Sequence, residues 1–152
     1  MAKVEKSVLV ARSARQMFDL VDTCENYPDF LPWCGQAVCD FRDETHTVGT
    51  LHINYHGVKT QFTTENDKKI PEWMRIKLVR GPFRQLAGMW RFIPLREDAC
   101  KVEFALSYEF SSKLFEKIIG PVFNHIANTF VDAFVKRARE MPPQPATKEP
   151  QP

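Results

Sequence analysis

The sequence predicts an α+β domain in which a curved antiparallel sheet of about seven strands wraps around one long C-terminal helix. Apolar and polar residues alternate with a period of two across most of residues 38–110, as they do in strands with one buried face. The connections between these alternating runs are short, which favours antiparallel pairing. From residue 111 a long apolar stripe recurs at helical spacing, and it is the one long element available to cover the apolar face of the sheet.

The N-terminal part of the chain predicts one strand and two short helices. Residues 3–10 alternate loosely, as a first strand does. Ser13 can cap a short helix, because apolar residues recur at helical spacing within residues 17–21. Residues 27–33 combine four large apolar side chains with two prolines, so that one or two helical turns fit before Pro32 ends them. Such a short segment cannot bury these side chains on itself, and we expect it to cover one end of the sheet as an apolar lid.

Residues 38–110 predict six further strands. Gly57 and the pair Gly81-Pro82 interrupt the alternation, as turn residues do. The last strand is the clearest, because its even-numbered residues from Val102 to Phe110 are apolar and its odd-numbered residues are mostly polar. The other clear runs of alternation cover residues 51–55, 58–64, 74–78 and 85–95.

A long helix is predicted from Ser111-Ser112 to about Met141, with an apolar stripe that starts at Phe115. Gly120-Pro121 predicts a kink or a break, because proline lacks an amide hydrogen and clashes with the preceding turn. Five prolines follow Met141, so we assign residues 1–140 to one domain and residues 141–152 to a disordered proline-rich tail. A strongly curved sheet closed over one helix is a helix-grip arrangement, and it leaves a cavity between sheet and helix unless side chains fill it.

The composition fits a single soluble domain. The chain has 152 residues, of which 43% are hydrophobic and 26% are charged. No apolar run approaches the ~18 residues that a membrane span needs, and the N-terminus resembles neither a secretory signal nor a transit peptide. The four cysteines form no C-x-x-C pair, so we expect reduced thiols. These features predict a cytoplasmic protein that could contact the inner membrane at its surface.

The charges are distributed unevenly along the chain. Residues 19–44 contain seven acidic residues and one basic residue, whereas residues 68–101 contain nine basic residues and three acidic ones. A chain with this asymmetry could orient on an anionic surface, either lipid headgroups or RNA phosphates. The alternative interpretation is that these charges lie on scattered, solvated strand faces.

The sequence offers few groups for catalysis or metal binding. His52 and His56 would lie about 13 Å apart on one strand, too far to share one ion at about 2.0–2.1 Å per ligand. His125 lies on a polar side of the last helix, where a solvated role is expected. The chain has no G-x-S-x-G motif, no cysteine with a recognisable partner pattern and no glycine-rich phosphate loop. We therefore expect neither enzyme activity, nor a metal site, nor a cofactor.

An excess of aromatic residues is the strongest functional signal. The chain contains 12 Phe, 3 Trp and 3 Tyr, which would line a large apolar cavity if many of them face it. Ligand sites are typically concave and mostly apolar, with a few polar groups. The alternative is that these side chains simply fill the core, but this explains residues 27–33 less well, because their bulk is out of proportion to their length. A mobile apolar lid suits a ligand that arrives from a membrane.

Residues 27–34, Tyr-Pro-Asp-Phe-Leu-Pro-Trp-Cys, resemble the signature of the coenzyme Q-binding proteins of the START-like, or polyketide cyclase-like, superfamily. The resemblance runs in order from about residue 3 to residue 139, so it spans nearly the whole domain. Because no mitochondrial transit segment precedes it, the bacterial branch of ribosome-association toxins is the nearer resemblance. Supporting matches lie at residues 17–21, 81–83, 90–95, 102–110 and 133–138.

The resemblance implies a START-like fold and a non-enzymatic carrier or chaperone that holds ubiquinone or a related isoprenoid lipid and supports respiration. By the motif match, the mouth of the cavity would be formed by Tyr27, Phe30, Leu31, Pro32 and Trp33. From the strand and helix faces, we expect Trp90, Phe92, Phe104, Tyr108, Phe123 and Phe130 to line it.

The bacterial branch implies a second function, that of a toxin which binds the large ribosomal subunit and blocks its joining with the small one. The basic stretch at residues 68–101 supports this alternative, because phosphate contacts dominate binding to nucleic acids. The two functions could use different surfaces of one protein. We expect a monomer and no DNA partner.

Overall fold

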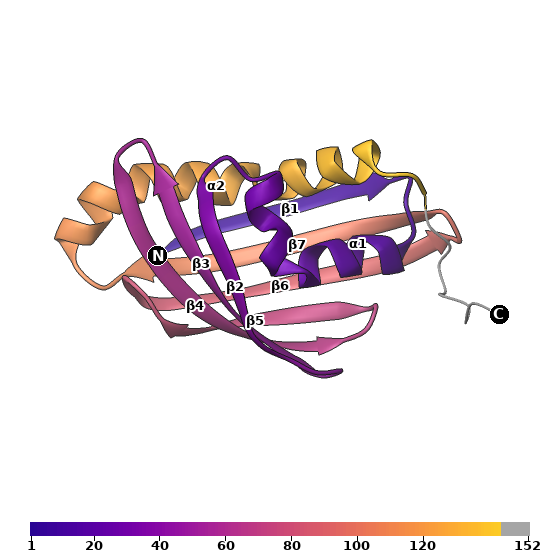
Figure 1. The fold of residues 1–152 in the computed structure, drawn as a ribbon, viewed down its shortest axis with the longest axis horizontal. Helices are drawn as coiled ribbons and strands as arrows, with labels where there is room; N and C mark the ends of the chain where they lie inside the picture. The colour runs from indigo at the N-terminus through magenta and orange to yellow at the C-terminus, as the bar shows by residue number, and fades with distance from the viewer. Residues whose placement is uncertain (144–152) are drawn as a thin grey trace.

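The computed structural model describes residues 1–143, and within them the chain forms one antiparallel sheet, two α-helices and one 3₁₀ helix (Figure 1). The expected tail at residues 141–152 lies outside the described residues from residue 144 onward. The elements in chain order are β1 (Ala2–Val10), α1 (Ala14–Asp22), the 3₁₀ helix η1 (Cys24–Asp29), β2 (Cys34–Arg42), β3 (His46–Tyr55), β4 (Val58–Lys69), β5 (Trp73–Arg80), β6 (Phe83–Arg96), β7 (Ala99–Phe110) and α2 (Lys113–Glu140).

The seven strands pair in the order β1-β7-β6-β5-β4-β3-β2, and every pair is antiparallel. Strands β2 to β7 therefore form a meander, and only β1 pairs out of sequence, from Ala2 opposite Tyr108 to Val10 opposite Cys100. In Figure 1, β2, β3 and β4 run steeply across β6 and β7, which shows how strongly the sheet curves. The predicted fold class, a curved antiparallel sheet with a long C-terminal helix, is confirmed.

The alternation in the sequence separates the two faces of the sheet. On β7 the even-numbered residues Val102, Phe104 and Leu106 are buried, while the odd-numbered residues from Lys101 to Glu109 face outward and are at least partly exposed. Helix α2 lies along this inner face (Figure 1) and buries Phe123, Phe134 and their apolar neighbours against it. The core therefore lies between the concave face of the sheet and α2.

Both α-helices begin at the serines that the sequence indicates. The Ser13 hydroxyl accepts a hydrogen bond from the Gln16 amide at 3.0 Å, and the Ser112 hydroxyl accepts one from the Phe115 amide at 3.1 Å. These bonds satisfy amide groups that have no partner inside the helix. The capping serines thus fix where each helix leaves the sheet.

Of the kink or break expected at Gly120-Pro121, the break is wrong, because α2 is continuous from Lys113 to Glu140, and the kink stays a prediction. Pro121 has no amide hydrogen to donate to the Lys117 carbonyl, one turn earlier in the helix. Both residues lie on the exposed side of α2. Water can solvate that carbonyl, so the helix tolerates the proline there.

The first turns of α2 also depart from the expected buried stripe. Leu114, Phe115 and Ile118 are exposed, Phe115 to 41%, because this part of the helix lies beyond the covered face of the sheet. By length and composition α2 could span a membrane. In this fold, however, it supplies the inner wall of the core, with Phe123, Phe134 and other residues fully buried.

Candidate ligand cavity

An apolar cavity of about 80 Å³ lies between α2 and the concave face of the sheet. Its walls come from α1, η1, strands β3 to β7 and α2. Pockets for drug-sized ligands usually measure about 300–1,000 Å³, so a molecule of that size would have to displace lining side chains. The cavity is lined by Val21, Asp22, Cys24, Tyr27, Trp33, Thr47, Gly49, Leu51, Phe62, Thr64, Asn66, Met74, Ile76, Leu86, Trp90, Phe104, Leu106, Phe123, Ile126, Ala127 and Phe130.

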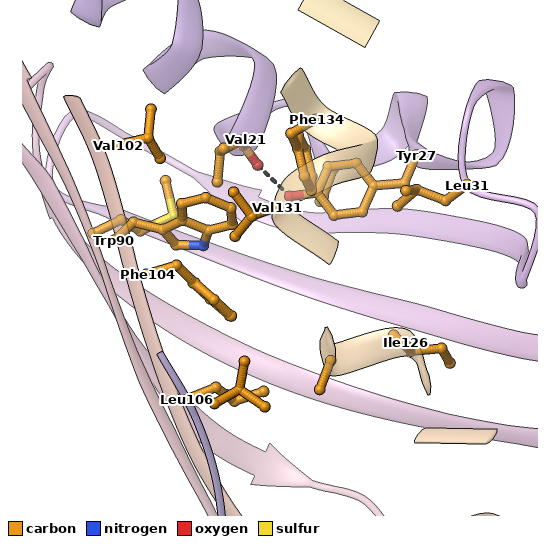
Figure 2. Close-up of a cluster of buried hydrophobic side chains, with 14 of the residues drawn as sticks. Val21, Tyr27, Leu31, Trp90, Val102, Phe104, Leu106, Ile126, Val131 and Phe134 are labelled. Atoms are coloured by element: carbon orange, nitrogen blue, oxygen red, sulfur yellow. Dashed lines mark hydrogen bonds between the residues drawn. The ribbon is translucent and has the colours of Figure 1, made fainter. Parts of the chain in front are cut away.

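Seven aromatic rings contribute to the apolar wall. Trp90 on β6 packs against Phe104 on β7 with ring centroids 4.5 Å apart, and against Phe130 on α2 at 5.8 Å. Trp33 closes on the same Phe130 ring at 6.1 Å. Figure 2 shows Trp90, Phe104 and Leu106 along the sheet, with Ile126, Val131 and Phe134 projecting from α2. These rings belong to different elements, so the cavity is a product of the tertiary fold.

Six of the eleven residues predicted for the site line the cavity, and five do not. Pro32 is exposed, Phe30 and Leu31 pack beside the cavity, and Phe92 and Tyr108 belong to the surrounding core. Phe92 stacks on the far side of Trp90 and contacts Phe18. The alternation of β6 and β7 gives the correct face, but the cavity occupies only part of that face. The lining residues from the predicted set are Tyr27, Trp33, Trp90, Phe104, Phe123 and Phe130.

The lid segment, residues 27–33, begins in η1 and is anchored by its own side chains. The Tyr27 hydroxyl donates a hydrogen bond to the Val21 carbonyl, drawn as a dashed line in Figure 2, and burial raises the pKa of Tyr27 well above its usual value. The Leu31 side chain is 1% exposed, and its amide donates to the Tyr27 carbonyl at 2.9 Å. As the sequence indicates, the segment holds only a short helix, and it buries its bulk against α2.

An ion pair fastens η1 to the sheet. Arg42 on β2 donates to both carboxylate oxygens of Glu25, at 2.7 and 2.9 Å, and to the Asp22 carbonyl at 2.8 Å. The hydrogen bonds from Arg42 lower the pKa of Glu25 below its ordinary value. A single guanidinium thus joins the end of α1, the start of η1 and β2.

A group of polar side chains interrupts the apolar wall at one place, which we call the polar corner (Asp22, Thr47, Asn66 and the adjoining Lys68). Asp22, Thr47 and Asn66 line the cavity. The Lys68 ammonium donates to Asp22 Oδ2 at 2.8 Å and to Thr47 Oγ1 at 2.9 Å, and the Lys68 side chain is only 1% exposed. Asn66 Oδ1 is buried and has no hydrogen-bond partner in the part of the chain that the structure describes.

Sequence reasoning missed the polar corner and counted Lys68 among the surface charges of residues 68–101. The signal for its burial is the parity of β4. Phe62, Thr64, Asn66 and Lys68 are separated by two residues each, so they share the inward face of one strand. Continuing the alternation past the apolar part of β4 would have placed Lys68 inside.

The ionisable groups in the cavity do not suit a nucleophile or a general base. Burial raises the pKa of Cys24 to about 12, and that of Tyr27 is also raised by burial, so both stay protonated at neutral pH. Asp22 is held by Lys68. All four cysteines are free, in agreement with the expected reduced thiols.

One group of side chains within residues 1–143 has the spacing of a metal site, on the outer face of the sheet. The ligand atoms of His46, Glu65 and Asp67 lie within 4.8 Å of one another. Asp67 already pairs with Lys77 at 2.7 Å and with His46 at 3.2 Å, and the bonds from Lys77 lower its pKa. These contacts describe a cross-strand ion-pair network.

The chain matches the family described as "Polyketide cyclase / dehydrase and lipid transport" over residues 10–135. That stretch contains all of the cavity lining described above. The chain belongs to this family. The polyketide cyclase-like membership expected from residues 27–34 is thereby confirmed.

Two relatives and two solved structures illustrate the range of this polyketide cyclase-like family. The chain is 41% identical to the ribosome association toxin RatA of Vibrio cholerae over 141 residues, 93% of this chain and 98% of that protein. It is 28% identical to the coenzyme Q-binding protein COQ10 homolog B of Xenopus laevis over 137 residues, 88% of this chain and 56% of that protein. These two relatives are not named as enzymes.

The solved structures establish the fold. The Zhui aromatase/cyclase from Streptomyces superposes with a TM-score of 0.78 at 15% identity, covering 91% of this chain and 94% of the other. A START superfamily protein from Mycobacterium smegmatis gives a TM-score of 0.71 at 20% identity, covering 91% of this chain and 97% of the other. Because these identities are low, the likeness extends to the fold alone.

Proposed function

We propose that this protein binds an isoprenoid quinone, such as ubiquinone, or a related isoprenoid lipid in the cavity beneath the lid segment, and that it acts as a non-enzymatic carrier. The observation that supports the proposal is the largely apolar cavity with aromatic rings in its wall, in a member of the polyketide cyclase / dehydrase and lipid transport family. The name of the COQ10 relative supports the quinone class. A cytoplasmic carrier would exchange its ligand by transient contact with the inner membrane.

The volume of the cavity sets a condition on binding. About 80 Å³ is too small for a substituted quinone ring with an isoprenoid tail. Binding therefore requires the lid segment or the aromatic rings around Trp33 and Phe130 to move apart. The lid segment lies outside the sheet and is held by the Tyr27 hydroxyl, by the bond from the Asn54 amide to the Trp33 carbonyl and by the burial of Leu31, so its opening would break these contacts.

The proposal is tested by mass spectrometry of an organic extract of the protein purified from bacterial cytoplasm. We expect a stoichiometric isoprenoid quinone or lipid in the wild type and its loss in Trp33→Glu, which places a charge in the wall. Trp73→Glu is the matched control, because Trp73 does not line the cavity and should retain the ligand. Circular dichroism and thermal melting verify that both variants fold. An empty wild-type protein would count against a carrier.

A second candidate function is association with the large ribosomal subunit, blocking its joining with the small one. The 41% identity to a ribosome association toxin favours it. Exposed basic residues on the outer face of the sheet offer contacts for RNA phosphates. Arg75 and Lys77 are two residues apart on β5 and therefore share one face. The exposed Arg91 on β6 pairs with Trp73, which lies on the same face of β5. This surface is separate from the cavity, so the two functions are compatible.

Ribosome co-sedimentation tests the second candidate. Reversing the charges of Arg75, Lys77 and Arg84 together to Glu should release the protein from the large subunit, and the binding of the wild type should weaken steeply with salt. The control reverses Lys113, Lys117 and Lys136 on α2, which changes the net charge equally at another surface. Equal release of both triple variants would remove the support for a specific basic face.

A further inference from the structure

The polar corner of the cavity contains an acceptor that no group within residues 1–143 satisfies. Asn66 lines the cavity from β4, and its Oδ1 atom is buried without a hydrogen-bond partner among the described residues. The amide nitrogen of the same side chain donates to Met74 Sδ at 3.5 Å. A buried polar atom without a partner costs about 1–3 kcal/mol, so such an atom beside a cavity indicates where a ligand completes the bond.

The donors of Lys68 and Thr47 at the polar corner are directed mainly at Asp22, and Lys68 itself does not line the cavity. Lys68 Nζ donates to Asp22 Oδ2 and Thr47 Oγ1, and the Thr47 hydroxyl donates in turn to Asp22 Oδ1 at 2.8 Å. Arg42 Nε adds a cation 3.6 Å from Asp22 Oδ2, so the carboxylate charge is compensated. On the residues that line the cavity here, the acceptors left for a ligand are Asn66 Oδ1 and the unused lone pairs of Asp22, and the donor left is the second amide hydrogen of Asn66.

We propose that the polar corner is a head-group subsite for a ligand that donates an O–H hydrogen bond, such as the phenol or hydroquinone ring of a reduced isoprenoid quinone. This inference rests on the function proposed above and specifies the chemical state of its ligand. A quinol donates its hydroxyl to Asn66 Oδ1. The oxidised quinone has only acceptors, so it leaves Asn66 Oδ1 unpaired.

The expected preference for the quinol over the quinone can be estimated from the loss of one hydrogen bond. A site built to bond a donor rejects an analogue that lacks it, because the buried acceptor stays unpaired. One such bond corresponds to about a tenfold difference in dissociation constant. The surrounding wall is apolar, with Val21, Met74 and Trp90 among its residues. A water molecule that bonded to Asn66 Oδ1 would therefore occupy the space that the ligand ring needs.

The test compares ubiquinone-1 with ubiquinol-1 under nitrogen by isothermal titration calorimetry, since the two ligands share ring substituents and tail. We expect the quinol to bind the wild type about tenfold more tightly. In Asn66→Leu the preference should fall to about twofold or less. Asn54→Leu is the matched control, because Asn54 is exposed on β3 outside the cavity, and it should keep the full preference.

The outcomes separate this inference from the proposed function. Equal binding of the two ligands by the wild type, or tighter binding of the quinone, would overturn the donor-selective subsite and leave the cavity as a binding site. Binding of neither ligand would overturn both. If Asn66→Leu does not fold, the ratio of the quinone and quinol dissociation constants of the wild type still decides whether the subsite selects a donor.

Discussion

Lys68 and Asp22 form an ion pair at 2.8 Å, with side chains 1% and 11% exposed. Removing one partner of a buried pair leaves the other charge uncompensated, at a cost of about 3–5 kcal/mol. We expect Lys68→Met to lower the free energy of unfolding, measured by urea denaturation, by about 3 kcal/mol. The loss should lie near the lower limit because Arg42, 3.6 Å from the Asp22 carboxylate, still compensates part of its charge. Lys69→Met is the control, since its side chain is 63% exposed, and it should change stability by less than about 0.5 kcal/mol. Similar losses in both variants would mean that Lys68 is not buried in solution.

The same residues show how far single positions could be predicted from the sequence. From its residue type, Lys68 was predicted to lie on the surface, because lysine is rarely fully buried. Its partner Asp22 is 46 positions away in the chain, so no local pattern connects them. Trp90 and Phe104, in contrast, were placed correctly, because strand parity is a local property and both are apolar. Prediction failed where a polar residue on the inner face depended on a distant partner.

Helix η1 depends on one side chain of β2 for its position, and this gives a prediction for an element. Arg42→Met should lower the melting temperature by about 2–3 °C at pH 7, because an exposed ion pair contributes about 1 kcal/mol or less. The pKa of Glu25 is lowered in the fold, so the pair stabilises above the ordinary value of 4.5 and loses its effect as the pH falls further. The difference between variant and wild type should therefore shrink below about pH 4.5.

Hydrogen exchange provides the control for this prediction. The Phe30 and Leu31 amides donate to the Tyr27 carbonyl, and both should exchange faster in Arg42→Met if the ion pair holds η1 in place. Amides in β7, far from Arg42 in the sheet order, should be unchanged. A pH-independent difference in melting temperature would assign the effect to packing of the arginine stem and not to its charge.

Whole elements were predicted more reliably than their ends and their surroundings. Alternation located the strands, and the apolar stripe located α2, because both periods are set by backbone geometry. The exposure of Phe115 and the continuity of α2 at Pro121 depend on where the sheet ends and on which side of the helix meets water. Those are properties of the assembled fold, which a periodic pattern does not contain.

At the scale of the whole molecule, the cavity is what remains when α2 and the sheet pack imperfectly. Its volume of about 80 Å³ could not be predicted, since it depends on how rings from five different elements interlock. The aromatic excess in the sequence therefore fits both interpretations raised by the composition: most of the rings form the core, and some of the same rings line the cavity. Retaining an unfilled space lowers stability, as cavities in cores do, and a ligand that fills it raises stability by mass action.

This balance gives a prediction with opposite signs for stability and binding. Ala127 on α2 lines the cavity and is 2% exposed. Ala127→Leu adds three carbon atoms to the unfilled space, so we expect a melting temperature equal to or above that of the ligand-free wild type. The same atoms occupy the ligand's volume, so extraction and mass spectrometry should find no isoprenoid in the variant. Asn128→Leu, at the next and exposed position, should retain the ligand. Ligand retained by Ala127→Leu would mean that the isoprenoid binds elsewhere, whereas a strongly lowered melting temperature would show that the cavity is too narrow to accept the added side chain.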